Sequence, residues 1–280
     1  MTIKAVIGSD LSSPFTRRQV FATLFVLGFA NGIVANIVGK VLSDGYVMAV
    51  TGTFGISVIV WVACFLGVKL VLGELDEPLT KADRVVALAA LTLFLVPISQ
   101  VSWVVLSGLA IYFLRTSRHG TTQARGAWII LAITVPMFWS PRLFSILSDS
   151  ILQLDAMLVS FLLGTQRLGN SVQLVDGSGY MWIASGCSSM ANVSLAILCW
   201  VLFSQFSDRQ RSPGDLWWCL LACGAVAAVN VVRISLIGRY PEQFELLHGP
   251  IGGSLAGGLS LGLMLVICAA GGRRVSLKHR

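Results

Sequence analysis

Three residue types that can act together in covalent catalysis occur in the C-terminal third of the chain. Cys187 opens one apolar run, Arg233 lies near the end of the next, and His248 precedes the last. A thiolate can attack a carbonyl carbon to form a thioester. A histidine can take the thiol proton and return it to a leaving amine. A fixed cation can stabilise the thiolate or the developing oxyanion. Together the three residues are suited to cysteine-based acyl chemistry.

Each of the three also has a plain structural interpretation. A cysteine in a membrane helix usually packs as a small apolar side chain, and we interpret the five cysteines other than Cys187 in this way. Arg233 could extend to the lipid headgroups, although an arginine within a span costs about 2.5–3.5 kcal/mol at mid-membrane. His248 could be an ordinary loop residue. Cys187 differs because a helix N-terminus favours the thiolate form.

Neighbouring residues add candidates for supporting roles. Asn230 lies three residues before Arg233 and therefore on the same helix face, where it could orient a partner, donate to the oxyanion or simply bond to another helix. Ser188 and Trp182 flank the cysteine and could support the site or contact a substrate. Residues 169–183 alternate polar and apolar side chains around glycines, which predicts a short extended hairpin. Such a hairpin could pair with an extended peptide, or it could be a plain lid over the helices.

The elements that must position these residues are membrane helices. Of the 280 residues, 55% are hydrophobic and 12% charged, and the mean hydropathy is +0.81. A soluble domain usually carries about 25% charged residues, so lipid is the solvent for most of this chain. We predict an all-α polytopic bundle that forms a single membrane domain over 1–280. Clear candidate spans, each near the ~20 residues that a bilayer requires, are 20–39, 47–72, 126–147, 187–206, 216–238 and 251–271.

Two further apolar regions need interpretation. Residues 85–114 would form a helix of about 45 Å, too long for a ~30 Å hydrocarbon core. Because Pro97, Ser99 and Gln100 interrupt this run, we predict a hairpin of two short spans. Residues 150–163 are short and carry Asp155, which favours an interfacial or re-entrant helix. The total is about eight spans. The first is predicted to be retained, since residues 1–19 lack the features of a cleavable signal.

Lys and Arg placement predicts the orientation, because cytoplasmic loops carry the excess of these residues. With both termini in the cytoplasm, four basic residues lie outside: Lys40, Arg142, Arg167 and Arg239. Fifteen lie inside: Lys4, Arg17, Arg18, Lys69, Lys81, Arg84, Arg115, Arg118, Arg125, Arg209, Arg211, Arg273, Arg274, Lys278 and Arg280. This topology places Cys187, Arg233 and His248 at the outer face, with His248 the only histidine there.

Other chemistries are disfavoured by the same sequence. The net charge of +7 comes from basic residues scattered at the ends of apolar runs, so nucleic acid is not an expected partner. Cys219 and Cys223 lie four residues apart in an apolar run without further ligands, and the outer His248 has no second ligand at usable spacing. We therefore expect no metal, no cofactor and no disulfide framework.

Taken together, the sequence resembles the exosortase/archaeosortase family of membrane transpeptidases. One matching piece is a glycine-rich outer segment that leads into a Cys-Ser pair at a helix start, here Gly169 to Ser188. The second is Asn230-Val231-Val232-Arg233 near the end of the next span, and the third is His248-Gly249 before the last span. The resemblance covers roughly 126–271, and the first four spans match only as hydrophobic helices.

The resemblance implies a Cys/Arg/His site that cuts C-terminal sorting signals of exported proteins. Such a signal has a short motif (Pro-Glu-Pro in the best-known case), a transmembrane helix and a basic tail. Cleavage would be followed by hydrolysis or by transfer to a membrane-bound acceptor. Carried over, Cys187 is the nucleophile, Arg233 the stabilising cation and His248 the acid/base. The expected location is the inner (cytoplasmic) membrane of a bacterium, with the site facing the periplasm or outside, and a link to exopolysaccharide production.

The sequence also departs from the family pattern. The usual Cys-Ser-Gly followed by an apolar and a basic residue is replaced by Cys187-Ser188-Ser189-Met190-Ala191-Asn192, which points to a divergent branch with a different signal. The alternative is a transporter or exopolysaccharide-assembly component without peptidase activity, in which Arg233 binds an anionic group. A transporter usually places its charged site near the bilayer midplane. A third reading, a structural subunit, predicts that none of the three residues matters individually.

Overall fold

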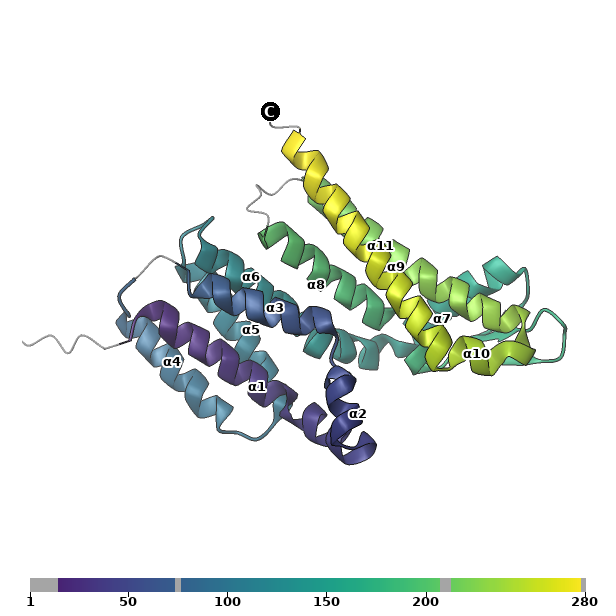
Figure 1. The fold of residues 1–280 in the computed structure, drawn as a ribbon, viewed down its shortest axis with the longest axis horizontal. Coiled ribbons are helices and arrows are strands. Elements are labelled where there is room, and N and C mark those ends of the chain that lie inside the picture. The colour runs from purple at the N-terminus through teal and green to yellow at the C-terminus, as the bar shows by residue number, and fades with distance from the viewer. Residues whose placement is uncertain (1–14, 74–76, 207–212, 278–280) are drawn as a thin grey trace, which may run out of the picture. The chain divides into compact units, whose positions relative to one another are not determined.

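The computed structural model describes residues 15–73, 77–206 and 213–277, and it is helical apart from one small sheet (Figure 1). Within those ranges the helices are α1 Arg17–Asp44, α2 Tyr46–Thr51, η1 Thr53–Gly55, α3 Val58–Val71, α4 Lys81–Phe94, α5 Ser99–Thr116, α6 Thr122–Thr134, the π-helical turn η2 Val135–Trp139, α7 Ser140–Leu163, η3 Ser185–Cys187, α8 Met190–Phe206, α9 Pro213–Arg239, η4 Pro241–Gln243, α10 Phe244–His248 and α11 Pro250–Leu277. The strands are β1 Arg167–Leu168, β2 Ser171–Gln173 and β3 Tyr180–Trp182.

Several helical segments are long and apolar enough to cross a membrane. In the described part of the chain there are five, at residues 17–44, 122–163, 185–206, 214–239 and 250–272. This agrees with the prediction of a helical membrane protein, whereas the count of eight spans stays a prediction. The helices divide into two compact units, and each is described by itself. Unit 1 comprises residues 1–55 and 65–130, and unit 2 comprises 56–64 and 131–280.

The predicted span at 47–72 is wrong as a single helix. The structure divides it into α2, the turn η1 and the 14-residue helix α3. Thr53 and Phe54 both have positive φ, 51° and 56°, and Gly55 follows with φ 72°. A right-handed helix cannot pass through residues in this conformation. Hydropathy alone could not reveal the break, because the run stays free of charge across it.

The predicted hairpin within 85–114 is present as two helices. α4 ends at Phe94 and α5 begins at Ser99, so the interruption falls around Pro97 as expected. The side-chain amide of Asn31, on α1, donates to the Phe94 carbonyl at 3.0 Å and to the Ser102 hydroxyl at 2.8 Å. This one side chain therefore joins the end of α4 to the start of α5.

The segment 150–163 is not a separate short helix but the last part of α7. It continues a helical run of 42 residues from Thr122 to Leu163, about 63 Å at 1.5 Å per residue. One straight span cannot contain this length in a ~30 Å core. The run is modified at the π-helical turn η2, which contains Pro136, and at Leu147, whose φ of −111° and ψ of 16° are not helical. Hydropathy suggested a boundary after 147, where the structure has this kink.

Unit 1 is held together by aromatic packing and by close helix contacts. Phe21 and Phe25 of α1 lie 4.8 Å and 5.9 Å from the Phe113 ring of α5. A Cβ added at Gly28 would come within 2.6 Å of Phe94, and one at Gly32 within 2.7 Å of Trp103. These two glycines, four residues apart, let α1 approach α4 and α5 closely, as small residues do in membrane helix packing.

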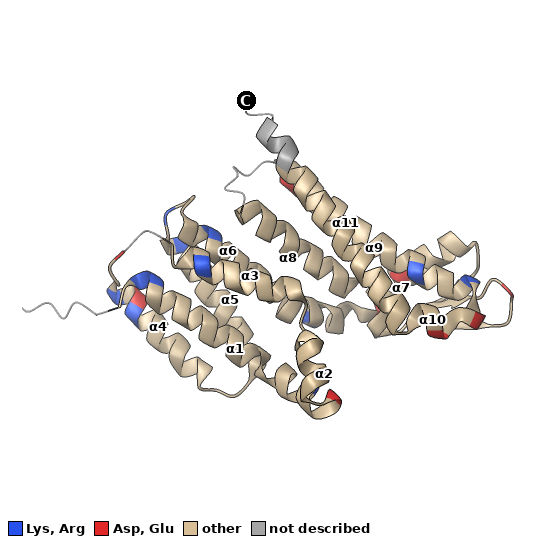
Figure 2. Cartoon of the chain, in the orientation of Figure 1, with Lys and Arg blue, Asp and Glu red and all other residues tan. Residues whose placement is uncertain are grey.

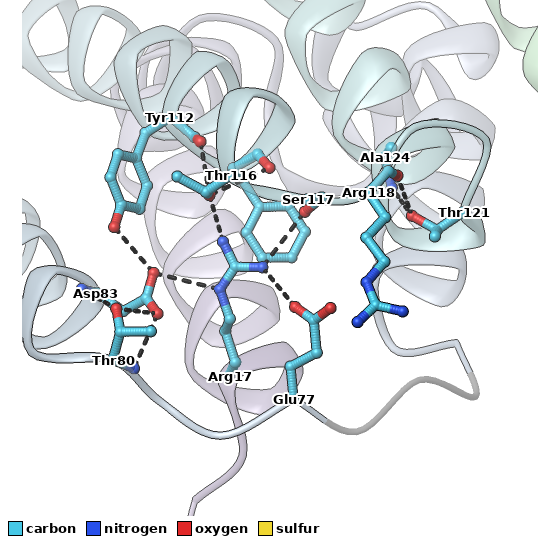
Figure 3. Close-up of polar contacts among 11 residues, drawn as sticks. Arg17, Glu77, Thr80, Asp83, Tyr112, Thr116, Ser117, Arg118, Thr121 and Ala124 are labelled. Carbon is cyan, nitrogen blue, oxygen red and sulfur yellow. Dashed lines mark hydrogen bonds and ion pairs between the residues drawn. The ribbon is translucent and has the colours of Figure 1, made fainter.

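The polar end of unit 1 is built around Arg17, the first residue of α1 (Figure 3). Its Nε donates to Asp83 at 3.2 Å and its Nη1 to Glu77 at 3.1 Å, and only 4% of its side chain is exposed. Nη2 donates to the Thr116 hydroxyl, and the guanidinium lies 4.6 Å from the centre of the Phe113 ring. The starts of α1 and α4 and the end of α5 therefore meet at one place.

Other helix ends join this polar end of unit 1. The guanidinium of Arg18 donates to the Gly73 carbonyl just after α3, and a Cβ on Gly73 would touch Thr122 at the start of α6. Figure 2 shows most of the Lys and Arg of this unit gathered where these helix ends meet. The up-and-down alternation predicted from basic residues is thus present in unit 1. Which side faces the cytoplasm stays a prediction.

Unit 2 packs α7, α8, α9 and α11 around two apolar clusters. The first unites α7, the sheet and α9, and its buried members are Leu152, Ala156, Val159, Val172, Ile183, Val231 and Ile234. The second unites α8, α9 and α11, and its buried members are Ala196, Cys199, Trp200, Ala222, Val226, Met264 and Cys268. Cys219 and Cys223 pack against the second cluster, as expected for cysteines that serve as small apolar side chains.

The three strands form one antiparallel sheet in the order β1-β2-β3. This agrees with the extended hairpin predicted for 169–183 and adds β1 to it. Its turn is closed by Asp176, whose carboxylate accepts from the Ser178 N–H at 2.9 Å and from the Ser178 hydroxyl at 2.7 Å. The Val175 N–H donates to the Gly238 carbonyl at 3.3 Å, so the sheet rests on the end of α9.

Candidate functional site

Cys187 lies in a tight turn between the sheet and α8. After β3 the chain makes the single 3₁₀ turn η3, in which the Cys187 N–H donates to the Ala184 carbonyl at 2.9 Å. The helix begins only at Met190, so Cys187 precedes the first helical residue rather than opening the helix as predicted. The cysteine is half-buried and packs beside the apolar cluster of α7, β2 and α9. Its position depends on what holds this turn.

Asn230 on α9 binds the turn directly. Its Nδ2 donates to the Cys187 carbonyl at 2.7 Å and lies 3.3 Å from the Ser189 hydroxyl. Its Oδ1 accepts from Arg233 Nη2 at 3.4 Å, one helical turn further along α9. Asn230 is only 4% exposed, so these bonds replace water. The structure therefore brings together Cys187 and the Asn-x-x-Arg pair that the sequence had singled out.

Asp155 is the functional candidate that the sequence analysis did not select. It lies on α7, is 4% exposed, and accepts from the Ser189 hydroxyl at 2.7 Å and from the Ser189 N–H at 3.1 Å. A carboxylate within an apolar segment is costly and usually marks a functional or paired position. That signal was visible in the sequence, but it served only to interpret 150–163 as a short helix. Ser189 itself could not be linked to Asp155 without the fold.

Ser188 and Ser189 form the entry to α8. The Ser189 carbonyl accepts the first helical bond, from the Val193 N–H at 3.0 Å, which makes Ser189 the N-cap. The Ser188 hydroxyl accepts from the Met190 N–H at 3.2 Å. Both serines are buried. Ser188, predicted to support the site or contact a substrate, thus caps the helix start, and its side chain does not reach the surface.

Arg233 is half-buried and has spare donor capacity. Its bond to Asn230 is long, and its Nε, shielded from solvent, has no hydrogen-bond acceptor among the residues that the structure describes. Most buried N–H donors in proteins are paired, and one that is not calls for a ligand, an ion or a water. The guanidinium can therefore serve an anionic or carbonyl oxygen near the Cys187 turn.

His248 is the predicted residue that the structure does not connect. It ends α10, is exposed, and stacks on Phe244 with ring centroids 4.9 Å apart and an interplanar angle of 16°. Within the described ranges, no hydrogen bond or ion pair links it to Cys187 or Arg233. α10 nevertheless packs against both α9, which carries Arg233, and α11 (Figure 1).

Strand β3, which leads into the Cys187 turn, has an open edge. The Ile183 N–H donates to the Asn170 carbonyl, and the Leu174 N–H donates to the Gly179 carbonyl. Because antiparallel pairs alternate, the N–H and C=O groups of Tyr180 and Trp182 point away from β2. Neither N–H has a partner in the described part of the chain. Their side chains are 52% and 64% exposed, so Trp182 lies at the surface beside the site.

No protein-family model, curated protein or solved structure matches this chain. Across residues 15–73, 77–206 and 213–277, no three His, Cys, Asp or Glu side chains lie together as a metal site would require. What the arrangement can do chemically follows from its own groups. The Cys187 thiol lies on a turn that Asn230 and Asp155 hold by hydrogen bonds. The Arg233 guanidinium, which has an unused donor, is bonded to Asn230, and the unpaired edge of β3 leads toward Cys187.

Proposed function

We propose that the protein is a membrane cysteine peptidase or transpeptidase that cleaves C-terminal sorting signals of exported proteins, as its resemblance to exosortases and archaeosortases implies. One observation carries the proposal. The backbone carbonyl of Cys187 accepts a hydrogen bond from Asn230, which in turn accepts from Arg233, so two motifs 43 residues apart in sequence meet in one hydrogen-bonded chain. Unit 2, from 131 onward, also coincides with most of the segment that carries the resemblance.

The reaction needs three side chains and an acceptor. The Cys187 sulfur attacks the scissile carbonyl carbon and gives up its proton to His248, while the carbonyl oxygen becomes an oxyanion beside Arg233. The C–N bond then breaks, the leaving amine takes the proton from His248, and a thioester remains. Water or the amine of an acceptor cleaves the thioester and restores the thiol. His248 is exposed and stacks on Phe244, which leaves the ring nitrogens at the edge free to exchange a proton.

An extended peptide is the substrate form that suits the sheet. A segment paired with the outward N–H and C=O groups of Tyr180 and Trp182 would continue β3 by strand addition. β3 ends five residues before Cys187, so a paired peptide would run toward the thiol. The exposed aromatic rings at these positions offer contact to the membrane interface or to the peptide.

The proposal includes the predicted topology of about eight spans, with both termini cytoplasmic. The site then faces the periplasm or outside of the inner membrane of a bacterium, in a role linked to exopolysaccharide production. In support, the basic helix ends of unit 1 gather on one side (Figure 2).

A transporter or assembly component without peptidase activity is the second candidate. The Nε of Arg233 has no acceptor among the described residues, which suits a site that binds an anion. His248 stacks on Phe244 and is not bonded to Cys187, and an anion-binding arginine needs neither His248 nor Cys187 as a catalyst.

The deciding experiment measures how Cys187 reacts with a membrane-impermeant maleimide on intact cells, over a range of pH. The other five cysteines, Cys64, Cys199, Cys219, Cys223 and Cys268, are replaced by Ala. The peptidase proposal expects labelling from outside, and expects both Arg233→Ala and His248→Ala to shift the pH dependence and abolish cleavage of a sorting-signal reporter. An inert thiol, labelling only from inside, or indifference to both substitutions would favour the second candidate.

A further inference from the structure

We infer that Asp155 and Ser189 are positioning residues for Cys187: the buried carboxylate on α7 clamps the turn that carries the thiol against α9. The inference rests on the proposed function only for its effect on turnover. The clamp itself rests on four hydrogen bonds inside unit 2, and Asp155, Ser189 and Asn230, which make them, are buried.

The hydrogen bonds run in one direction. Arg233 donates to Asn230 Oδ1, Asn230 Nδ2 donates to the Ser189 hydroxyl, and that hydroxyl donates to Asp155 Oδ1. Each middle group accepts from one neighbour and donates to the next, so the chain is internally consistent. It begins at a cation on α9 and ends at an acid on α7. If the Asn230 amide were reversed, its oxygen would face the Cys187 carbonyl oxygen, and two acceptors cannot bond each other. The orientation with Nδ2 toward Cys187 is therefore the one that satisfies the contacts.

The chain holds the Cys187 turn at two points, at the cysteine itself and just beyond it. Asn230 binds the Cys187 carbonyl at 2.7 Å. Two residues on, Asp155 binds the Ser189 N–H at 3.1 Å and its hydroxyl at 2.7 Å. Two anchors from two different helices fix the short stretch between them, so they determine where the thiol points relative to Arg233. Asp155 touches neither thiol nor guanidinium, and it acts through Ser189.

Ordinary helix capping does not account for Asp155. Ser189 already serves as the N-cap of α8, and a polar N-cap needs no buried carboxylate behind it. Burying an acid in an apolar bundle is costly. Here the acid binds both the N–H and the hydroxyl of Ser189, two residues after Cys187. The geometry specified here is that of the Cys187 turn.

The test uses the full-length protein carrying Cys187 as its single cysteine. Asp155→Asn keeps the shape but places an amide donor against the donors of Ser189. Misplacement of a reacting group by about 1 Å can cost about 10²-fold in rate. We expect the alkylation rate of Cys187 and the kcat for a sorting-signal peptide each to fall at least tenfold, with KM unchanged. The matched control is Asp149→Asn, an exposed acid on the same helix.

A second pair of variants keeps the test informative if Asp155→Asn fails to fold. Ser189→Thr and Ser189→Val add the same volume, but only Thr retains the hydroxyl. We expect Thr to react like the parent and Val to be slowed as Asp155→Asn is. Combining Ser189→Val with Asp155→Asn should slow the reaction no further, because both substitutions break the same Asp155–Ser189 contact. Equal alkylation rates for Thr and Val, or a rate for Asp155→Asn within twofold of the parent, would overturn the inference.

Failure of the proposed peptidase function and failure of the positioning role of Asp155 give different results. If the parent protein cleaves no peptide, the proposed function fails, while the alkylation rates still decide whether Asp155 positions the thiol. If the parent cleaves the peptide and Asp155→Asn cleaves it equally well, the positioning role alone fails.

Discussion

Arg17 and Arg233 are two arginines shielded within helices of one protein, and their surroundings differ. All three nitrogens of Arg17 donate to acceptors: Nε to Asp83, Nη1 to Glu77 and Ser117, and Nη2 to Thr116. Arg233 makes one long bond to Asn230 and leaves Nε without an acceptor in the described residues. A cation that is fully paired has nothing left to offer a ligand. The comparison teaches that burial of an arginine is not the mark of a site, whereas unused donor capacity near a thiol is.

The sharpest test of this contrast is to truncate each arginine. Arg17→Ala leaves the Asp83 carboxylate buried without its cation, and breaking such a pair costs about 3–5 kcal/mol. Arg233→Ala breaks one long bond at a half-buried site and should cost far less. Thermal unfolding in detergent measures both, with the exposed Arg84→Ala as control. Equal losses for Arg17→Ala and Arg233→Ala would remove the distinction.

Replacing charged residues with apolar ones of similar volume should separate their effect on stability from their effect on cleavage. A buried ion pair exchanged for apolar residues of similar volume is often neutral or stabilising by about 1–4 kcal/mol. Arg17→Leu combined with Asp83→Leu should therefore recover most of the stability lost in Arg17→Leu alone. Arg233→Leu, which breaks one long hydrogen bond, should unfold at nearly the parental temperature and yet show no peptide cleavage. Cleavage by Arg233→Leu would contradict the assignment of Arg233 to the site.

The glycines of α1 and α11 sharpen the comparison of the two units. A Cβ at Gly32 would lie 2.7 Å from Trp103, whereas one at Gly257 would meet nothing within 4 Å. Gly32→Ala should destabilise unit 1 by about 1–3 kcal/mol through overpacking. Gly257→Ala should be neutral or stabilise by up to about 1 kcal/mol, because Ala is the better helix former. Gly39→Ala, on α1 with open space around it, serves as the control in unfolding measurements.

The smallest expected effect is acid sensitivity of the Arg17 cluster. Burial raises the pKa of the Asp83 carboxyl, but hydrogen bonds from Thr80 and Tyr112 and the charge of Arg17 outweigh it, so the pKa is lowered. A lowered native pKa contributes stability that is complete above the ordinary Asp value of about 3.9. That stability is lost as the pH falls through the native value.

Asp83 lies before the hairpin of two short spans predicted within 85–114. The unfolding temperature of the parent should therefore drop more between pH 5 and the acid range than that of Asp83→Asn. If the unfolding temperatures of the parent and of Asp83→Asn fall in parallel with pH, Asp83 does not cause the acid sensitivity.

Much of the fold was predictable because hydropathy is a local property. The apolar runs, the break near Pro97 and the alternation of basic helix ends could each be inferred from the residues nearby. The break at Thr53 and Phe54 could not, since positive φ at two non-glycine residues leaves no trace in hydropathy. Nor could the continuity of α7 through 150–163, where the polar Asp155 suggested a separate interfacial or re-entrant helix and is instead 4% exposed within α7.

The candidate site divides in the same way. Residue type and spacing alone identified Cys187, Asn230 and Arg233, because a thiol at a helix entry and a cation in an apolar run are unusual locally. Only the tertiary structure decided that Asn230 bonds the turn of Cys187, that Asp155 clamps Ser189, and that His248 stands apart. The two contacts join residues 34 and 43 positions apart in sequence, and His248 lacks such a contact within the described residues. All three outcomes depend on how the helices pack. The sequence determined which chemistry is available, and packing decided which groups share it.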